Sequence, residues 1–147
     1  MIIEEEIITL SEPVILWNGA VINRFSHVLK GARIGMDTMI GEHCYVGAKA
    51  QIGDRCKIQN HNNIWDGITI GEGVFIGPNC TLTNHFDPRK RGGVFVPDET
   101  VIGANATISA GACIVAPCVI GRNAMVAAAS TVLRDVKDDE FVKGTVK

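Results

Sequence analysis

A short polar stretch near the middle of the chain carries the side chains best suited to chemistry. Asn84 and His85 open it, and Arg89 follows a few positions after the histidine. Histidine exchanges its proton near neutral pH, so His85 could serve as the general base that deprotonates a nucleophile. The amide of Asn84 could either polarise a reacting carbonyl oxygen or hold an amine in place. We take His85 and Asn84 as the candidate catalytic residues.

A second polar group precedes this stretch in the sequence. It comprises Gln59, Asn60, His61, Trp65 and Asp66. Amide, imidazole, indole and carboxylate groups together could bind a polar substrate through hydrogen bonds. Whether this group lies beside His85 depends on the elements between them, which a repeat in the sequence defines.

An aliphatic residue recurs at every sixth position along most of the chain. Each step of six from Leu16 to Leu82 lands on Leu, Ile or Val, and the same spacing resumes from Ile102 to Val132. Mostly small residues stand two positions earlier, and glycine often follows the aliphatic residue. Because side chains two apart in a strand point the same way, each unit sends one aliphatic and one small residue inward. A glycine after each strand permits a tight corner.

Short strands separated by regular corners wind a coil, and three such units close a triangular turn of roughly 18 residues. The sequence therefore predicts an all-β fold, a parallel β-helix of about six coils, as a single domain over residues 1–147. Small and aliphatic side chains in a narrow interior agree with an aromatic content of only 5%. Residues 1–12 are expected to cap the open end, and residues 134–147 to form a C-terminal tail.

The repeat is interrupted once. Between Leu82 and Ile102 the chain is much longer than the single step of six that the repeat needs, so the surplus must leave the coil. We expect an extruded loop over residues 83–99, which contains Asn84, His85 and Arg89. Loops on a rigid scaffold often carry function, and a tolerated surface insertion is the simpler alternative.

Coil stacking predicts that the second polar group lies beside this loop. Positions one full turn apart lie one above another at the spacing of adjacent strands, so Asp66 is expected beneath Asn84. Gln59 and Trp65 also occupy corner positions where the repeat otherwise favours glycine. We therefore expect both polar groups to form one site.

The remaining histidines and the cysteines favour structural roles. His43 and His61 are one turn apart and should stack at one corner, although the polar neighbours of His61 keep a binding role open for it. Zinc would need three histidines, two of them close in sequence, and we expect no metal from this spacing. Four of the five cysteines occupy the small inward position and should be buried fillers rather than disulfide partners. These are Cys44, Cys56, Cys80 and Cys118.

Composition excludes several classes of protein. Lysine and arginine number 14 against 16 aspartates and glutamates, so the chain lacks the basic surplus of a nucleic-acid binder. No apolar run approaches the roughly 18 residues of a membrane span. The first residues are acidic where a secretory signal would be basic, and the cysteine count is odd, so we expect a cytoplasmic protein.

The pattern resembles the hexapeptide-repeat acyltransferases along nearly the whole chain. In that family the coils wind left-handed and the proteins usually work as trimers. The resemblance therefore implies a left-handed parallel β-helix and a homotrimer with sites between subunits.

One branch of that family, the N-acetyltransferases of 3-amino-sugar nucleotides, is similar to this chain over its central part. The matching motifs are Lys57-Ile58-Gln59-Asn60, Trp65-Asp66-Gly67, Val74-Phe75-Ile76-Gly77-Pro78-Asn79, Thr83-Asn84, Pro88-Arg89 and Ile102-Gly103-Ala104-Asn105-Ala106-Thr107-Ile108. The resemblance implies an acetyl-CoA-dependent N-acetyltransferase that acts on the amine of a UDP- or dTDP-linked amino sugar, for polysaccharide or lipopolysaccharide precursors. The substrate-binding residues it implies are Gln59, Asn60, His61, Trp65, Asp66 and Arg89.

The segment from Ala127 to Val136 resembles the last coil of the family, which offers backbone groups to the pantetheine arm of CoA and a basic residue to its phosphates. An ordinary capped end of the coil is an equally open interpretation. The chain departs from the family after Val142, where relatives usually continue into a helix. The CoA-binding residues that the resemblance implies are Ala110, Ala127, Ala128, Arg134 and Lys137.

Two other functions stay open. Residues 84–92 also resemble the loop of maltose and galactoside O-acetyltransferases, in which a histidine is the catalytic base, with matches at His85, Asp87, Pro88 and Arg91. A sugar hydroxyl needs such a base far more than an unprotonated amine does. The other alternative is a non-catalytic hexapeptide scaffold, which would bind no acetyl-CoA.

Overall fold

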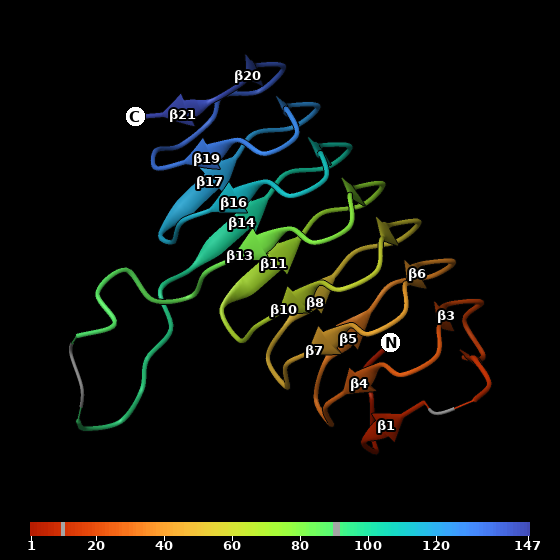
Figure 1. Cartoon of the computed structure of the whole chain (residues 1–147). Helices are drawn as coiled ribbons and strands as arrows, with labels where there is room; N and C mark the ends of the chain where they lie inside the picture. Colours follow the sequence, from red (N-terminus) through yellow and green to blue (C-terminus); the bar gives the residue numbers. More distant parts are fainter. Residues whose placement is uncertain (10, 90–91) are drawn as a thin grey trace.

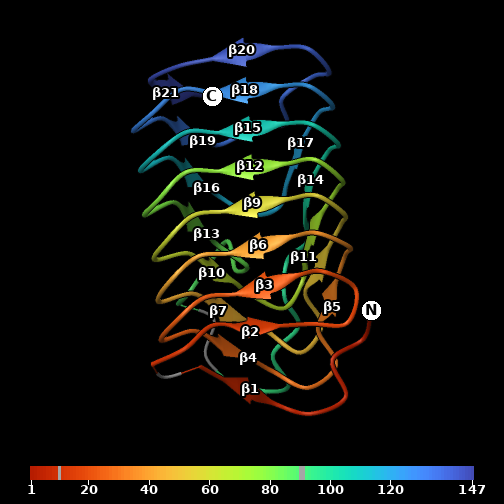
Figure 2. The same ribbon diagram turned by 90° about the vertical axis from the view of Figure 1, so that its right-hand side faces the viewer.

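The computed structural model describes residues 1–9, 11–89 and 92–147. Within these ranges the chain is all-β and winds a parallel β-helix of about seven turns, consistent with left-handed coils (Figure 2). The predicted fold class is confirmed. The described ranges contain no α-helix, and accordingly no helix that is long and apolar enough to cross a membrane.

Three faces of stacked strands enclose the interior (Figures 1 and 2). The first face consists of β2 (Val14–Ile15), β3 (Val21–Ile22), β6 (Met39–Ile40), β9 (Lys57–Ile58), β12 (Phe75–Ile76), β15 (Thr107–Ile108), β18 (Met125–Val126) and β20 (Phe141–Val142). The second face consists of β1 (Ile7–Ile8), β4 (His27–Val28), β7 (Tyr45–Val46) and β10 (Asn63–Ile64), followed by β13 (Thr81–Leu82), β16 (Cys113–Ile114), β19 (Thr131–Val132) and β21 (Thr145–Val146). The third face consists of β5 (Arg33–Ile34), β8 (Gln51–Ile52), β11 (Ile68–Ile70), β14 (Thr100–Ile102) and β17 (Cys118–Ile120).

The six-residue period produces columns of aliphatic side chains inside the coil. On the first face, Ile40 pairs in register with Ile58, Ile58 with Ile76, and Ile76 with Ile108, and all four are fully buried. β-branched side chains fit such pleated, closely stacked strands. The four cysteines assigned to the inward position are buried and free, as predicted.

The loop leaves the coil where the repeat predicts an interruption. Phe75 pairs with Lys57 in the preceding coil and with Thr107 in the following one, and the second interval along the chain is much the longer. The additional residues project sideways between β13 and β14 (Figure 1). Lys90 and Arg91, which belong to the expected loop, lie outside the described residues.

The end of the chain adds a turn that the repeat did not show. Met125 pairs with Phe141 and Thr131 pairs with Thr145, and both pairs are closer in sequence than a full turn of three six-residue units. These shortened spacings break the period of six, which is why the sequence predicted about six coils and the structure has about seven.

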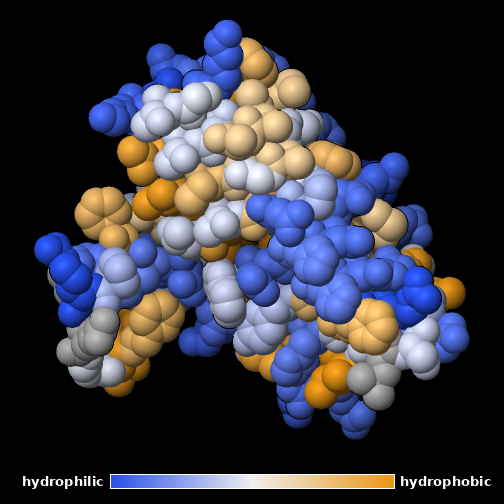
Figure 3. Space-filling view, in the orientation of Figure 1, coloured by the Kyte–Doolittle hydropathy of each residue, from blue (hydrophilic) through white to orange (hydrophobic). Residues whose placement is uncertain are grey.

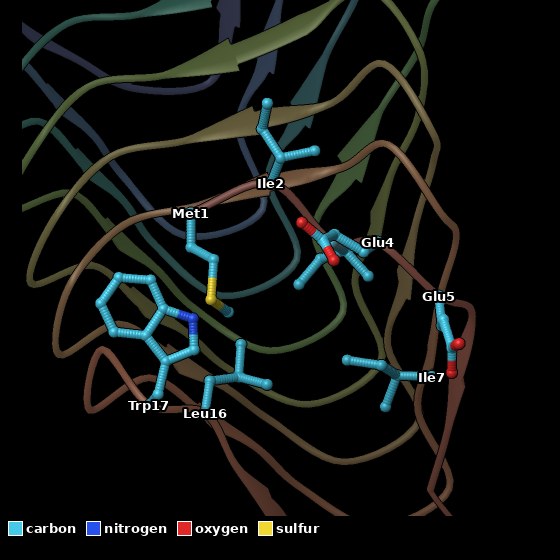
Figure 4. Close-up of a pocket in the computed structure, with 8 residues that line it drawn as sticks. Met1, Ile2, Glu4, Glu5, Ile7, Leu16 and Trp17 are labelled. Atoms are coloured by element: carbon cyan, nitrogen blue, oxygen red, sulfur yellow. The ribbon is translucent and has the colours of Figure 1, made fainter.

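Two antiparallel strands lie at the N-terminal end of the coil. β1 pairs with β4, and β2 pairs with β3, in contrast to the parallel pairing between later coils. The N-terminal segment crosses this end and leaves a largely apolar cavity of about 550 Å³ beside Met1, Leu16 and Trp17 (Figure 4). Leu10, in the expected cap, lies outside the described residues.

The packing of the interior columns determines stability. Val126→Ala, at a fully buried position, should lower the free energy of unfolding by about 2 kcal/mol, because it removes buried methyl groups and leaves a cavity. Val119→Ala makes the same change where the side chain is 47% exposed and should cost about 0.5 kcal/mol or less. Urea denaturation of both variants measures the difference, and equal losses would contradict a stability that depends on these columns.

Candidate active site

The base of the extruded loop is held by three hydrogen bonds. Asp98 N–H donates to the carbonyl of Asn84 at 2.9 Å, and Phe86 N–H donates to the Asp98 carboxylate at 2.7 Å. The Asn84 amide nitrogen donates to the backbone carbonyl of Asp66 at 3.1 Å, which is the stacking that the repeat predicts. The residues next to His85 are therefore tied both to the returning end of the loop and to the coil beneath.

His85 lies at this base with a carboxylate beside one ring nitrogen. Its Nδ1 is 3.6 Å from Asp98 Oδ2, which is longer than a hydrogen bond, and this buried nitrogen has no hydrogen-bond partner among the described residues. The ring packs edge-on against Phe95 at a centroid distance of 5.5 Å. His85 also lines a cavity of about 310 Å³ enclosed by residues 92–96.

Sequence reasoning missed Asp98. The only sequence feature that could have indicated Asp98 is its position at the end of the loop, shortly before the repeat resumes. A carboxylate facing Nδ1 can orient the imidazole and stabilise the charge that forms when Nε2 accepts a proton. Such contacts are often long in unliganded enzymes, and a closure of about 0.5 Å would make this one a hydrogen bond.

Trp65 and Asp66 lie at the same corner as Asn84. Asp66 Oδ1 accepts the backbone N–H of Lys49, one coil below, at 2.9 Å. Gly47 faces this carboxylate, since a Cβ there would stand 2.5 Å from Asp66 Oδ1. The Asp66 side chain thus stabilises the stacking of two coils. Trp65 extends outward and is 37% exposed.

The structure separates the rest of the second polar group from the loop. Gln59, Asn60 and His61 precede β10, at the corner between the first and second faces, whereas Trp65 follows β10. The second face separates these two corners, so within one chain Gln59, Asn60 and His61 do not lie beside the loop. The His61 ring stacks on His43 with centroids 4.9 Å apart, as predicted, and Asn60 Oδ1 accepts the N–H of Glu42 at 2.9 Å.

The loop arginine is paired within the loop. The Arg89 guanidinium donates to both carboxylate oxygens of Asp87, at 2.7 and 3.0 Å, and this hydrogen bonding raises the pKa of Arg89. A substrate phosphate would have to compete with that carboxylate for the guanidinium. Arg91, matched to the alternative loop motif, lies outside the described residues.

The residues expected to contact CoA lie on both edges of the second face. Ala110, Ala127 and Ala128 stand at its corner with the first face, where Ala129 N–H donates to the Ala110 carbonyl at 2.9 Å. Between the edges, the outward residues Thr81, Cys113 and Thr131 are uncharged. Figure 3 shows pale and apolar residues gathered over this upper part of the molecule. Small, uncharged residues permit the close approach of an extended ligand.

Arg134 and Lys137 belong to the opposite side of that face. The Arg134 guanidinium donates to Glu140 at 2.8 Å, and the backbone N–H of Lys137 donates to the same carboxylate at 2.8 Å. The hydrogen bond from Arg134, followed by that from Lys137, lowers the pKa of Glu140 from 4.5 to about 2. The expected phosphate partner is thus held by a carboxylate of the last turn.

An apolar hollow lies beside Phe86, on the side of the loop that faces the C-terminal coils. Its volume is about 370 Å³, and it is lined by Phe86, Val115, Ala116, Pro117 and Leu133. Phe86 follows His85 and Leu133 precedes Arg134. The hollow is therefore bordered by the sequence neighbours of His85 and Arg134, while His85 itself lines the separate cavity beside residues 92–96.

Within the described ranges, no group of three or more His, Cys, Asp and Glu side chains could hold a metal ion. The thiols do not form a reactive group either. Burial raises the pKa of Cys44, Cys56, Cys80 and Cys118, which keeps these thiols protonated.

Comparison with known sequences defines the class of protein. A sequence model of the bacterial transferase hexapeptide, described as six repeats, matches residues 49–84 and 99–134. A model of the hexapeptide repeat of succinyl-transferase matches residues 31–60 and 67–116. The chain belongs to the hexapeptide-repeat family. The first match stops at the extruded loop and resumes beyond it.

Curated relatives share most of this chain but are much longer. The chain is 36% identical over 129 residues to the bifunctional protein GlmU of Sorangium cellulosum, which covers 88% of this chain and 25% of that protein. It is 31% identical over 134 residues to GlmU of Lactococcus lactis subsp. cremoris strain MG1363, covering 88% of this chain and 24% of the other. The chain thus spans about a quarter of the length of these relatives.

Two solved structures share the fold at a TM-score of 0.72. One is PerB from Caulobacter crescentus in complex with CoA and GDP-perosamine, 21% identical, with 85% of this chain and 54% of that chain covered. The other is the acetyltransferase domain of PglB from Neisseria gonorrhoeae FA1090 in complex with acetyl coenzyme A, 20% identical at the same coverage. At this identity the likeness establishes the β-helix.

The contact between Arg134 and Glu140 predicts a pH-dependent stability. Because the pKa of Glu140 is lowered on folding, its contribution is complete above pH 4.5 and is lost as the pH falls toward about 2. Glu140→Gln should therefore lower the melting temperature by a few degrees at pH 7 and by less at pH 3. Thermal unfolding at both pH values measures this, with the exposed Glu12→Gln as control. An equal loss at both pH values would contradict a role for the ionised carboxylate.

Proposed function

We propose that the chain is an acetyl-CoA-dependent N-acetyltransferase that acts on the amine of a nucleotide-linked amino sugar. The observation that carries the proposal is the pair of His85 and Asp98 at a hydrogen-bonded loop base, between the apolar hollow of Phe86 and Leu133 and the Trp65 corner. PerB was solved with CoA and GDP-perosamine, and the PglB domain with acetyl coenzyme A, on the same fold. The GDP-perosamine N-acetyl transferase of Caulobacter crescentus was also solved in a form in which one histidine is replaced by alanine.

The geometry supports a direct transfer. The unprotonated sugar amine would attack the thioester carbonyl, forming the C–N bond as the C–S bond breaks. His85 Nε2 would take the proton that the amine loses, with Asp98 stabilising the imidazolium, and would return it to the departing CoA thiolate. Asn84 stands next to His85 with its amide nitrogen donating to Asp66, which favours the task of holding the loop base over that of polarising the carbonyl.

The remaining parts of the proposal concern cofactor, assembly and context. Acetyl-CoA would extend along the uncharged second face, with Ala110, Ala127 and Ala128 at one edge and Arg134 and Lys137 beyond the other. We further propose a homotrimer that brings the Gln59–His61 corner of one copy toward the loop of the next. We also propose that the sugar is linked to UDP or dTDP and that the protein is cytoplasmic. Its product would serve as a precursor of lipopolysaccharide or a related polysaccharide.

A sugar O-acetyltransferase is the second candidate, because the same histidine and carboxylate could activate a hydroxyl. The two are separated by measuring CoA release from acetyl-CoA with amino-sugar nucleotides, free maltose and free galactosides. Turnover with a nucleotide-linked amine alone supports our proposal. Turnover with free sugars alone contradicts it in favour of O-acetylation. No turnover and no acetyl-CoA binding would indicate a scaffold.

Replacement of the base should slow the reaction without unfolding the protein. His85→Ala should lower kcat with the best amino-sugar nucleotide by about 10²–10⁴-fold at pH 7, the range expected for general-base catalysis. The loss should shrink at higher pH, where hydroxide can take the proton that the attacking amine loses. Steady-state kinetics from pH 6 to 9 and a melting curve test this, and full activity at pH 7 would exclude His85 as the base.

Asp98 should act on the histidine rather than on the substrate. Asp98→Asn keeps the shape and the acceptor for Phe86 N–H but removes the charge that faces His85 Nδ1. We expect kcat to fall about 10-fold or more with little change in the KM for either substrate, and the acidic limb of the pH profile to shift. A change confined to KM would instead indicate that Asp98 contacts the substrate.

A further inference from the structure

Three aromatic rings form a row along the second face, outside the interior columns. His27 and Tyr45 are paired in register on β4 and β7, and their ring centroids are 5.7 Å apart in an edge-on arrangement. The Tyr45 ring is 5.0 Å from the Trp65 ring at an interplanar angle of 44°. At the far end of the row, His27 contacts Glu6. In a chain with only 5% aromatic residues, this row concentrates ring surface on one face.

The corner that carries the indole lies over a glycine of the coil below. Gly47 pairs with the Trp65 corner, its N–H donating to the Ile64 carbonyl at 2.8 Å. A Cβ at Gly47 would meet Asp66 and the Trp65 backbone, so this corner stacks closely on the coil below, while the indole beside Tyr45 remains 37% exposed. The row thus presents ring surface to solvent instead of burying it.

The row ends next to the candidate active site. Trp65 directly precedes Asp66, whose carbonyl holds the Asn84 amide beside His85. One coil rises about 4.8 Å, so Tyr45 lies on the order of two coils below the loop base. The apolar hollow with Leu133 lies on the other side of the loop base, toward the C-terminal coils. The two neighbourhoods of His85 are therefore distinct in chemistry.

We propose that Trp65 and Tyr45 form the stacking surface for the nucleobase of the nucleotide-linked sugar, an inference that rests on the proposed function. Stacking on an aromatic side chain is favourable for every base, because every base has a π-face. Lys30 and Lys49 are exposed at the same edge, in the two coils below Trp65, where their ammonium groups could meet a diphosphate. The sugar amine would then extend up to His85.

This assignment has a consequence for specificity. The row offers flat rings, and stacking on them is favourable for every base. The protein should therefore accept uridine, thymidine and guanosine diphosphates with affinities within about 10-fold of one another. Sugar recognition would depend on the loop rather than on the base.

Tryptophan fluorescence tests the stacking directly. In a Trp17→Phe variant, which changes the indole at the distant N-terminal end, the emission comes from Trp65 alone. We expect UDP, dTDP and GDP to quench it with saturation, and pyrophosphate and ribose 5-phosphate to leave it unchanged. No quenching by the three nucleotides, or equal quenching by pyrophosphate, would overturn the proposal.

Substitutions provide a second readout. Trp65→Leu should weaken UDP binding, measured by calorimetry, about 10-fold or more, and Trp65→Tyr should restore most of it. Trp17→Leu makes the matched change at an exposed tryptophan and should leave the affinity unchanged. Melting curves verify that each variant folds, and Tyr45→Leu supplies an independent variant of the same surface.

The outcomes separate this inference from the proposed function. Quenching by the nucleotides without turnover of any amino-sugar nucleotide would support the stacking surface and contradict the proposed acetyltransferase activity. If Trp65→Leu turns over the amino-sugar nucleotide with an unchanged KM for it, the acetyltransferase activity is supported and the stacking surface is contradicted. If Trp65→Leu alters the oligomeric state while UDP affinity is unchanged, the face is an interface between copies and the inference is wrong.

Discussion

Every part of this structure depends on the hydrogen bonding of each coil to the next in register. Gly41 N–H donates to the carbonyl of Ile58, and Gly47 N–H donates to that of Ile64, both at 2.8 Å. Such bonds align equivalent positions of successive coils, so each position of the repeat becomes a column parallel to the axis. A side chain is thereby placed by its register, and its neighbours above and below follow.

The small inward column also satisfies buried backbone groups where the coil turns. Ser26, Thr38 and Asn62 each donate to the carbonyl of a glycine in the next coil and accept an N–H from a cysteine there, with distances between 2.7 and 3.0 Å. Because these polar groups are paired on both sides, they can be fully buried at little cost. Asn62 belongs to this column, which explains one member of the polar run at residues 60–63 without a ligand.

The same register determines how the candidate site can be built. The loop base stands above Asp66, whose side chain and carbonyl are both committed to the coils around it. His85 and Asp98, at the base of the loop, therefore lie beside a rigid support. The second face divides the surface into an aromatic part below the loop and an uncharged, partly apolar part above it. A donor and an acceptor of different chemistry could approach His85 from these two sides.

The sequence by itself determined the architecture. The period of six, the small inward position and the single interruption of the repeat predict the β-helix, its columns, the stacking of His43 on His61 and the place of the loop, because strand alternation and coil stacking are local rules. The sequence did not predict features that depend on irregular spacing or on the distance between corners of the coil. The shortened last turn has no period, and the Gln59–His61 corner is separated from His85 by the second face. Only the tertiary structure decided that Asp98 faces His85, that Glu140 holds Arg134, and that Trp65 lies on Tyr45. Each of these contacts joins residues of different segments through side-chain conformations, which packing determines and which a repeat does not encode.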